Sequence, residues 1–405
     1  MTGRYTGGVR CPRCRADYPE AAAHRVCPAC RLEGVHVNPA PVYDLAGLDA
    51  PVMSTGSGMF RYRDLLPLRQ RPISLGEGDT PLLPLPRAGR DTGLDLWWKD
   101  ESRNPTWSYK DRLAAVAVSK AVEDGADTVV VSSTGNHGAA VAAYAARAGI
   151  RCVVLTLASV PPTMKTLIQS YGATVVALRR PADRWVVMAQ GVEQRGWVPM
   201  SGYLDPPPGS NPFGVDGYKT IAYELVESLG RRPDVVVAPV AYGDGIAGVL
   251  RGFDDLLTMG VIDSLPRIVA AEPYGAFAAQ LRIADPITPP PGGTVSFSIA
   301  AVTASWQGTD AIRRSGGTAV RVSDEDTMAA QRSLSATEGL YAEASSAITF
   351  AALAELVAPG RIRPGEQVVL LGTSGGLKDP AATAALLPEV PLIEPSLEAF
   401  DRAVG

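Results

Sequence analysis

A single lysine, Lys110, lies inside the string NPTWSYKDR at residues 104–112, between a tyrosine and an aspartate. A lysine amine reacts with aldehydes to form a Schiff base when burial or nearby cations lower its pKa. Taken alone, Lys110 is better explained as a solvated lysine at the start of a helix, paired with Asp111. Its interpretation as a nucleophile therefore depends on other parts of the chain.

Three glycine-rich turns could bind an anionic ligand near this lysine. They are SSTGNHG at residues 132–138, GDGIAG at residues 243–248 and GTSGG at residues 372–376, and each follows a short apolar run. Free backbone N–H groups at such turns bind phosphate or carboxylate, and the dipole of a following helix favours the anion. In α/β proteins, turns of this kind lie at the carboxyl ends of the strands, where ligands bind.

Two cofactors fit these turns. Gly243, Gly245 and Gly248 match the dinucleotide fingerprint G-x-G-x-x-G. Asp244 lies inside that turn, however, and the motif comes past the middle of the chain, which both disfavour a dinucleotide. Pyridoxal phosphate combines a phosphate, an aldehyde that reacts with lysine and an electron sink. A phosphate-binding turn together with Lys110 therefore favours pyridoxal phosphate.

Four of the five cysteines form two CxxC pairs, Cys11 with Cys14 and Cys27 with Cys30. Thiolates at this spacing can close a tetrahedral zinc site, and four thiolates leave no open coordination position, so the predicted zinc ion is structural. Two disulfides in a secreted protein are the alternative, which the absence of a signal-peptide pattern disfavours. Cys152 lies in an apolar run and is predicted to be a buried strand residue.

Composition limits the class of protein. The chain has 405 residues, of which 46% are apolar and 20% charged, and its net charge is −4. This length suits two or three domains. The acidic balance and the lack of a basic run argue against nucleic acid as a partner, and no apolar run reaches the roughly 20 residues of a membrane span. We therefore expect a soluble, cytoplasmic protein.

The elements that must position these residues alternate between strands and helices. Short valine-rich runs bounded by Gly, Asp and Pro are typical of buried parallel strands, and amphipathic stretches lie between them. This alternation predicts an α/β fold with parallel sheets. The predicted strands are 94–99, 128–132, 151–157, 174–178, 234–240, 267–271 and 367–371, and the predicted helices include 113–123, 139–148, 218–229 and 347–356.

Four motifs together resemble the threonine synthase family, whose members are pyridoxal-phosphate enzymes. The strings NPTWSYKDR (104–112), STGN (133–136), EASSA (343–347) and GLKDP (376–380) follow in the family order, and the family has NPTGSFKDR at the first of them. The resemblance covers about three-quarters of the chain, from residue 80 to residue 380. It implies a fold-type II, tryptophan synthase β-like architecture, and zinc knuckles also occur in many relatives.

The resemblance also implies a division of the chain and a quaternary state. Residues 1–45 would form the zinc-ribbon segment, residues 46–106 and 232–405 a large cofactor-binding domain, and residues 107–231 a small domain that carries the carboxylate-binding loop. Relatives are often dimers, so a homodimer is expected. The expected ligand is a small amino-acid substrate.

Site roles carry over position by position. Lys110 would bind the cofactor covalently and later move protons at the substrate Cα, and Thr373 would face the pyridine nitrogen, with a slip to Ser374 left open. Lys219 and Lys378 also match family positions and are interpreted as structural ion pairs, whereas the role of Glu343 is open. Asn136 would bind the 3′-oxygen of the cofactor, Ser133 and Thr134 would bind the substrate carboxylate, and the segment Ala241, Tyr242, Gly243, Asp244 and Gly245 would bind the cofactor phosphate.

The chain departs from the family where the substrate binds. Gly209 and Gly214 replace a Ser and an Arg that hold the substrate phosphate in relatives, and Tyr242 replaces an Asn of the cofactor-phosphate turn. Losing an Arg that binds phosphate through two hydrogen bonds is costly. O-phosphohomoserine is therefore a doubtful substrate unless Arg179, Arg180 or another cation replaces that Arg.

Two further departures lie beside the reacting groups. Trp107 replaces the family Gly and either packs over the domain hinge or forms a wall of a reshaped substrate pocket. His137 replaces a Thr, and it either caps a helix or acts as a general acid toward the leaving group. Serine/threonine dehydratases also carry a His at this place.

The sequence thus predicts a threonine synthase-like, pyridoxal-phosphate-dependent lyase that catalyses elimination or replacement at Cβ or Cγ of an amino acid, with a substrate altered from O-phosphohomoserine. The alternatives are a serine/threonine dehydratase-like deaminase, a true threonine synthase, and a chain that binds the cofactor without catalysis. Intact Lys110, Asn136 and Thr373 disfavour the last of these.

Overall fold

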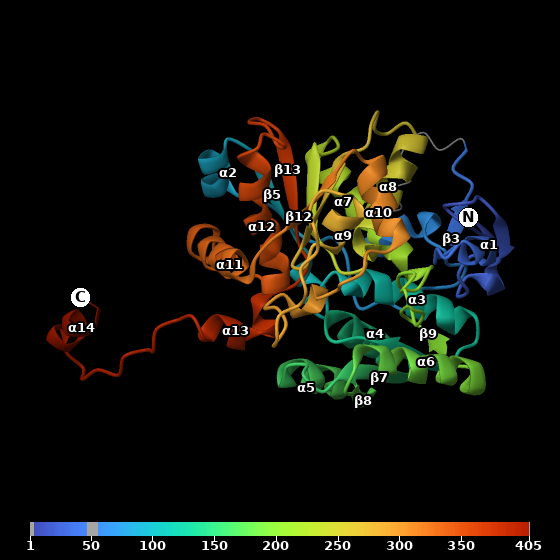
Figure 1. Cartoon of the computed structure of the whole chain (residues 1–405), viewed down its shortest axis with the longest axis horizontal. Helices are drawn as coiled ribbons and strands as arrows, with labels where there is room; N and C mark the ends of the chain where they lie inside the picture. The colour runs from blue at the N-terminus through green and yellow to red at the C-terminus, as the bar shows by residue number, and fades with distance from the viewer. Residues whose placement is uncertain (1–3, 47–55, 405) are drawn as a thin grey trace.

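A computed structural model describes residues 4–46 and 56–404 of the chain. Residues 47–55, which belong to the predicted large domain, lie outside the described residues. Figure 1 shows two layered α/β parts, one above the other, with the N-terminal segment at one side.

The upper part contains a six-stranded sheet in the order β12-β11-β10-β13-β5-β4, in which all neighbouring strands are parallel except β4 and β5. The strands are β4 (Leu82–Pro84), β5 (Asp95–Asp100), β10 (Val235–Pro239), β11 (Arg267–Glu272), β12 (Thr318–Arg321) and β13 (Gln367–Gly372). The helices of this part are α2 (Pro86–Thr92), α7 (Lys219–Leu229), α8 (Asp244–Thr258), α9 (Ala276–Gln280), α10 (Trp306–Arg314), α11 (Asp324–Glu338), α12 (Ala344–Val357) and α13 (Pro380–Ala384).

Both faces of this sheet are covered by helices. Val235 and Val237 belong to the core that also contains apolar residues of α2, α11 and α12, whereas Val236 and Ala238 belong to the core with α7, α8 and α10. Side chains of a strand alternate between its two faces, so a strand buried on both sides must be apolar at every position. This explains the continuous valine run that predicted β10.

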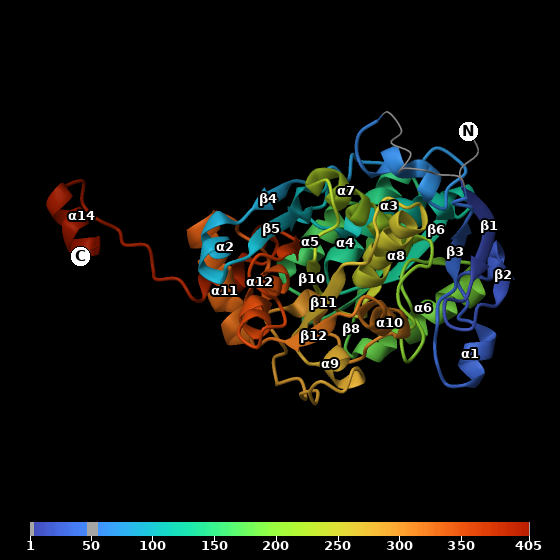
Figure 2. The ribbon, with the colours of Figure 1, turned by 90° about the horizontal axis from the view of Figure 1, so that it is seen from above.

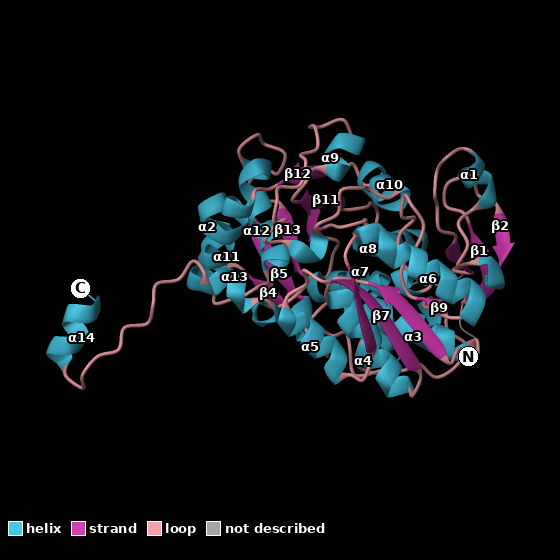
Figure 3. Cartoon of the chain, turned by 60° about the horizontal axis from the view of Figure 1, so that its bottom comes forward, coloured by secondary structure: helices cyan, strands magenta, loops and turns pink. Residues whose placement is uncertain are grey.

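The lower part contains a four-stranded parallel sheet in the order β8-β7-β6-β9, and Figure 3 shows its strands in magenta beside those of the larger sheet. The strands are β6 (Thr128–Ser132), β7 (Arg151–Leu157), β8 (Thr174–Leu178) and β9 (Val198–Pro199). The helices here are α3 (Lys110–Glu123), α4 (Asn136–Ala148), α5 (Pro162–Ser170) and α6 (Pro181–Arg195). Cys152 is 7% exposed in β7, as predicted.

The N-terminal segment forms a small antiparallel sheet in the order β2-β1-β3, with β1 (Tyr5–Arg10), β2 (Asp17–Pro19), β3 (Ala40–Tyr43) and the short helix α1 (Pro28–Leu32). At the other end of the chain, α14 (Leu397–Val404) follows an extended linker and lies apart from the rest of the molecule (Figures 1 and 2). The structure describes no helix that is long and apolar enough to cross a membrane.

Candidate active site

Lys110 is the first residue of α3 and points at two stacked tyrosine rings. Its Nζ lies 4.6 Å from the ring centre of Tyr109 and 5.6 Å from that of Tyr218, and it donates a hydrogen bond of 3.2 Å to the Tyr109 hydroxyl. The two rings are 4.8 Å apart and nearly parallel. Asp111 is fully buried and instead accepts hydrogen bonds of 2.8 Å from the backbone N–H and hydroxyl of Thr106. The interpretation of Lys110 as a solvated lysine paired with Asp111 is therefore wrong.

A buried ion network fixes the start of α3. Arg112 is fully buried and donates to Glu101 and Glu224 at 2.7–2.8 Å, and Lys99 donates to Glu224 at 2.6 Å. A buried guanidinium is tolerated only when it is paired and its N–H groups are satisfied. The network therefore holds the helix turn that carries Lys110 against the strand β5.

The loop after β6 presents the start of α4 to the same region. The Ser133 hydroxyl accepts hydrogen bonds from the N–H groups of Gly135 (3.2 Å) and Gly138 (3.0 Å), so it caps the loop. The amide of Asn136 donates to Glu343 Oε2 (2.9 Å) and accepts a hydrogen bond from Lys378 Nζ (2.6 Å). One N–H of the Asn136 amide remains for another acceptor.

Lys378 is not part of an ion pair within the described residues, so that prediction is corrected. Its amine donates to Asn136, and burial lowers its pKa to about 8, although the charge of Glu343 acts in the opposite direction. The sequence pattern missed this chain of contacts, because the three residues lie in separate motifs. Lys219 does form a structural ion pair, 2.6 Å from Asp255.

His137 lies in the first turn of α4 beside Lys110. Its Nε2 is buried and has no hydrogen-bond partner in the described part of the chain. Burial and the positive charge of Lys110 lower the pKa of His137 to about 3. The imidazole is thus neutral near pH 7, which argues against a charged general acid in this state.

Asp244 is the first residue of α8, directly after the turn that follows β10, and its side chain is buried. Asp244 Oδ1 accepts hydrogen bonds from the N–H of Ser210 (2.8 Å) and from Gln307 (2.6 Å). Burial raises its pKa, and the charge of Lys110 opposes that shift. Gly243 has φ +90°, and a Cβ there would lie 2.6 Å from the Gly308 Cα, so this turn requires glycine. The first N–H groups of α8 have no intrahelical partner and suit an anion.

The turn after β13 brings two hydroxyl groups close together. The hydroxyls of Thr373 and Ser346 lie 2.9 Å apart, and the Ser374 N–H donates to Ser346 at 2.8 Å. The Ser374 hydroxyl donates to the Trp107 carbonyl at 3.1 Å. Each of the two hydroxyls thus has one hydrogen-bond partner: Ser374 is bonded to the NPTWSYKDR loop, and Thr373 to Ser346.

Trp107 has an unusual backbone conformation. Its φ is +60°, a left-handed value that favours glycine, and its side chain is 52% exposed. A bulky residue at this value is strained. This backbone conformation explains why the family has Gly at this position and why a bulky residue there lowers the stability of the fold. The half-exposed ring is compatible with packing over the domain hinge and with a place in the wall of a substrate pocket.

Trp107→Gly is expected to stabilise the protein by about 1 kcal/mol, because glycine removes a left-handed penalty of about 1–2 kcal/mol that its own flexibility offsets in part. Denaturant unfolding of the holoenzyme measures the change. Trp107→Ala is the control, because it removes the ring and keeps the strained backbone. A Gly variant less stable than the Ala variant would contradict the strain argument.

The four cysteine sulfurs of the N-terminal segment lie within 4.8 Å of one another. The Sγ atoms of Cys11 and Cys30 are 3.7 Å apart, and those of Cys14 and Cys27 are 3.5 Å apart; all four cysteines are free thiols. A tetrahedral zinc site with Zn–S bonds of about 2.3 Å places its sulfurs about 3.8 Å apart. The cluster therefore has the dimensions of a four-thiolate zinc site.

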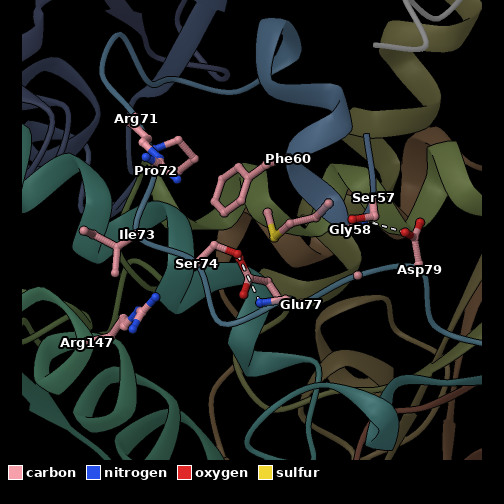
Figure 4. A pocket seen from close by; sticks show the side chains of 13 residues that line it. Ser57, Gly58, Phe60, Arg71, Pro72, Ile73, Ser74, Glu77, Asp79 and Arg147 are labelled. Atoms are coloured by element: carbon pink, nitrogen blue, oxygen red, sulfur yellow. Dashed lines mark hydrogen bonds between the residues drawn. The ribbon is translucent and has the colours of Figure 1, made fainter. Parts of the chain in front are cut away.

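A cavity of about 620 Å³ is lined by none of the predicted site residues (Figure 4). Phe60, Arg71 and Arg147 are among its lining residues. Glu77 in its wall accepts a hydrogen bond of 2.6 Å from Tyr144 of α4. This contact connects the cavity wall to the helix whose first turn carries Asn136.

Comparison with known proteins identifies the class to which this fold and site belong. Residues 73–374 match the family model described as pyridoxal-phosphate dependent enzyme. A solved structure of maize serine racemase is similar with a TM-score of 0.65 and 21% identity, covering 76% of this chain and 91% of that one. A threonine deaminase from Solanum lycopersicum has a TM-score of 0.61 and 21% identity, covering 75% and 87%. The chain belongs to the family of pyridoxal-phosphate dependent enzymes.

Within this family, the chain is similar to threonine synthases over most of its length. That of Methanosarcina acetivorans is 31% identical over 98% of both chains. That of Halalkalibacterium halodurans is 33% identical over 85% of this chain and 96% of its own. The resemblance to threonine synthase and the fold-type II α/β architecture predicted from the motifs are thus confirmed.

Proposed function

We propose that this protein is a threonine synthase-like, pyridoxal-phosphate-dependent lyase acting on a substrate other than O-phosphohomoserine. The observation that carries the proposal is the position of Lys110, which has no acidic partner in the described residues and lies over the Tyr109–Tyr218 stack. A lysine held in this way is available to an aldehyde.

The polar atoms around Lys110 fit the cofactor. Ser108 Oγ and His137 Nε2 are buried without partners in the described structure, and such atoms are expected to meet a ligand or water. The first N–H groups of α8 suit its phosphate, and Asn136 has a free N–H for its 3′-oxygen. When bound, pyridoxal phosphate supplies the electron sink for carbanion chemistry.

The remaining residues would bind and orient the substrate. The N–H groups around Thr134 at the start of α4 would hold the α-carboxylate, and the amine of Lys110 would move the proton at Cα. The hydroxyl of Thr373, paired with Ser346, would face the pyridine nitrogen. A hydroxyl there, instead of a carboxylate, leaves that nitrogen largely without a proton and weakens the electron sink.

His137 would contact the leaving group as a neutral imidazole. Its pKa of about 3 leaves one ring nitrogen protonated at neutral pH, so it can donate a hydrogen bond without carrying charge. The same residue favours the second candidate, a serine/threonine dehydratase-like deaminase.

Three further proposals accompany this one. The cysteine cluster would hold a structural Zn²⁺, since its sulfur–sulfur distances suit that ion. The chain would divide into the ribbon, large and small domains predicted from the family pattern. A cytoplasmic homodimer remains the prediction for location and assembly.

The function is tested by supplying the purified, cofactor-loaded protein with L-serine, L-threonine, L-homoserine, their O-phosphates and L-aspartate. We expect conversion of at least one of them other than O-phosphohomoserine, with release of its hydroxyl or phosphate substituent, whereas L-aspartate has no such leaving group and serves as a control. Phosphate release that yields threonine from O-phosphohomoserine identifies a true threonine synthase, whereas keto-acid formation from serine or threonine identifies a deaminase. A protein that binds the cofactor and converts none of them contradicts the proposal.

A further inference from the structure

The amide of Asn136 lies between a buried cation and a buried anion. Its Oδ1 accepts a hydrogen bond of 2.6 Å from Lys378 Nζ, and its Nδ2 donates one of 2.9 Å to Glu343 Oε2. All three side chains are buried. Within the described residues Lys378 and Glu343 form no direct ion pair, and each is instead bonded to the amide between them.

The two charges allow only one orientation of this amide. An ammonium group has donors and no acceptor, whereas an ionised carboxylate has acceptors and no donor. If the amide of Asn136 were turned over, its NH₂ group would face the ammonium of Lys378 and its oxygen would face the carboxylate of Glu343. Both hydrogen bonds would then become repulsive contacts, so the two neighbours determine where the amide nitrogen lies.

The backbone holds these two neighbours in place relative to each other. Glu343 directly precedes α12, and Lys378 ends a short 3₁₀ turn after β13. The N–H of Glu343 donates to the Ser374 carbonyl at 3.1 Å, and the N–H of Gly376 donates to the Tyr341 carbonyl at 3.0 Å. The anion and the cation are therefore placed by one pair of hydrogen-bonded backbone segments.

Glu343 is itself fixed by a further partner. Its other carboxylate oxygen, Oε1, accepts a hydrogen bond of 2.6 Å from the hydroxyl of Ser298, which lies in the irregular segment between α9 and α10. A Cβ at Gly135 would lie 3.8 Å from the Ser298 Cβ, so this segment packs against the loop before α4. A carboxylate that is bonded at both oxygens cannot rotate freely, so its direction toward Asn136 is fixed from two sides.

One N–H of the Asn136 amide is left for a ligand. An amide nitrogen carries two N–H groups, and Glu343 accepts a hydrogen bond from one of them. An amide turned over would present its oxygen in place of the other N–H. An ionised 3′-oxygen of the cofactor accepts hydrogen bonds and does not donate them, so the orientation that Lys378 and Glu343 select is the one that suits it.

We propose that Lys378 and Glu343 are positioning residues for the cofactor, which hold the Asn136 amide with its N–H toward the 3′-oxygen of pyridoxal phosphate. Both act through the amide and not by touching the cofactor. The charge of Lys378 also polarises the amide through its oxygen, which strengthens the N–H as a donor. This inference rests on the proposed function, in which Asn136 binds the 3′-oxygen, and it gives a role to Glu343 and a new one to Lys378.

The test exchanges the two charges in the double variant Glu343→Lys/Lys378→Glu, which should turn the amide over so that its oxygen meets the 3′-oxygen. Titration of the full chain with pyridoxal phosphate, followed by visible absorbance, measures the apparent dissociation constant and the position of the cofactor band. We expect the dissociation constant to rise about 10- to 100-fold, as for loss of a hydrogen bond to a charged group, and the band to shift.

Two single variants test the same orientation without reversing both charges. Lys378→Met removes one of the two constraints, so it should raise the dissociation constant about 5-fold and shift the band in the same direction. Lys378→Arg keeps a donor opposite the amide oxygen and should stay near the wild-type values.

The charge exchange should act only through Asn136. In an Asn136→Ala background it should change the dissociation constant by no more than about 3-fold, because residues that work through one shared partner are not additive. Lys219→Met, which breaks the buried ion pair with Asp255, is the control for destabilisation, and it should lower the melting temperature and leave the cofactor band in place.

An equal band shift in the Asn136→Ala background would overturn the proposal, since the charges would then act on the cofactor directly. An unshifted band in both Lys378→Met and the double variant would overturn it as well. If the wild type itself shows no band of covalently bound cofactor, it is the proposed function that fails.

Discussion

Lys110→Ala is expected to abolish covalent binding of pyridoxal phosphate and to lower turnover by a factor on the order of 10³ or more, as removal of a covalent catalyst does. In the structure Lys110 lies over the Tyr109–Tyr218 stack and has no carboxylate partner in the described residues. The two other lysines at family positions have different partners, since Lys378 donates to Asn136 and Lys219 pairs with Asp255. Borohydride reduction of the loaded protein, followed by mass spectrometry, measures the modified peptide.

Two controls separate covalent chemistry from charge. Lys110→Arg keeps the cation over the tyrosine rings and is expected to lose the covalent adduct as well. Lys165→Ala, whose amine donates to the Ala158 carbonyl on the surface, should keep it. An adduct found on any other lysine in the wild type would contradict the assignment of Lys110.

Most strands could be predicted because the chemistry of a buried parallel strand is visible in the sequence. All seven predicted strands are present within one residue of their predicted ends, since strands such as β10 must be apolar on both faces. The helices α3 and α4 begin three residues earlier than predicted, at Lys110 and at Asn136. The first turn of α3 is polar because Asp111 and Arg112 bond to Thr106 and to the buried glutamates, and the first turn of α4 carries Asn136 and His137. The apolar period therefore starts only after these turns.

The contacts between distant motifs could not be predicted in the same way. Asn136, Glu343 and Lys378 form one hydrogen-bonded chain, although each was assigned separately. A residue whose role depends on a contact with a distant part of the chain has no recognisable pattern in a single sequence.

Loss of the cysteine cluster is expected to have a large effect on the stability of the N-terminal segment. Structural zinc sites contribute about 10–16 kcal/mol of apparent binding free energy in small zinc domains. Cys27→Ser should therefore remove the metal and unfold the N-terminal segment. This segment contacts the rest of the molecule through Glu20, which accepts a hydrogen bond of 2.5 Å from Arg69. Its strands form a sheet of their own, so the two larger sheets should keep their fold. Trypsin then gains access to Arg10, Arg13, Arg15, Arg25 and Arg31.

Elemental analysis and limited trypsin digestion of the full chain measure both effects. The wild type should contain one zinc per chain and keep its N-terminal segment, and chelation should reproduce the Cys27→Ser pattern. Cys152→Ala is the matched control, because Cys152 is equally buried but lies in β7 of the small sheet. A metal-free wild type with protected arginines would show that the thiols pack without an ion. Cleavage that spares the cofactor band would show instead that the cysteine cluster can unfold while the cofactor site persists. Cys11, Cys27 and Cys30 do form a small core of their own, although Tyr5, Val9 and Ala23 of the same segment belong to the main core.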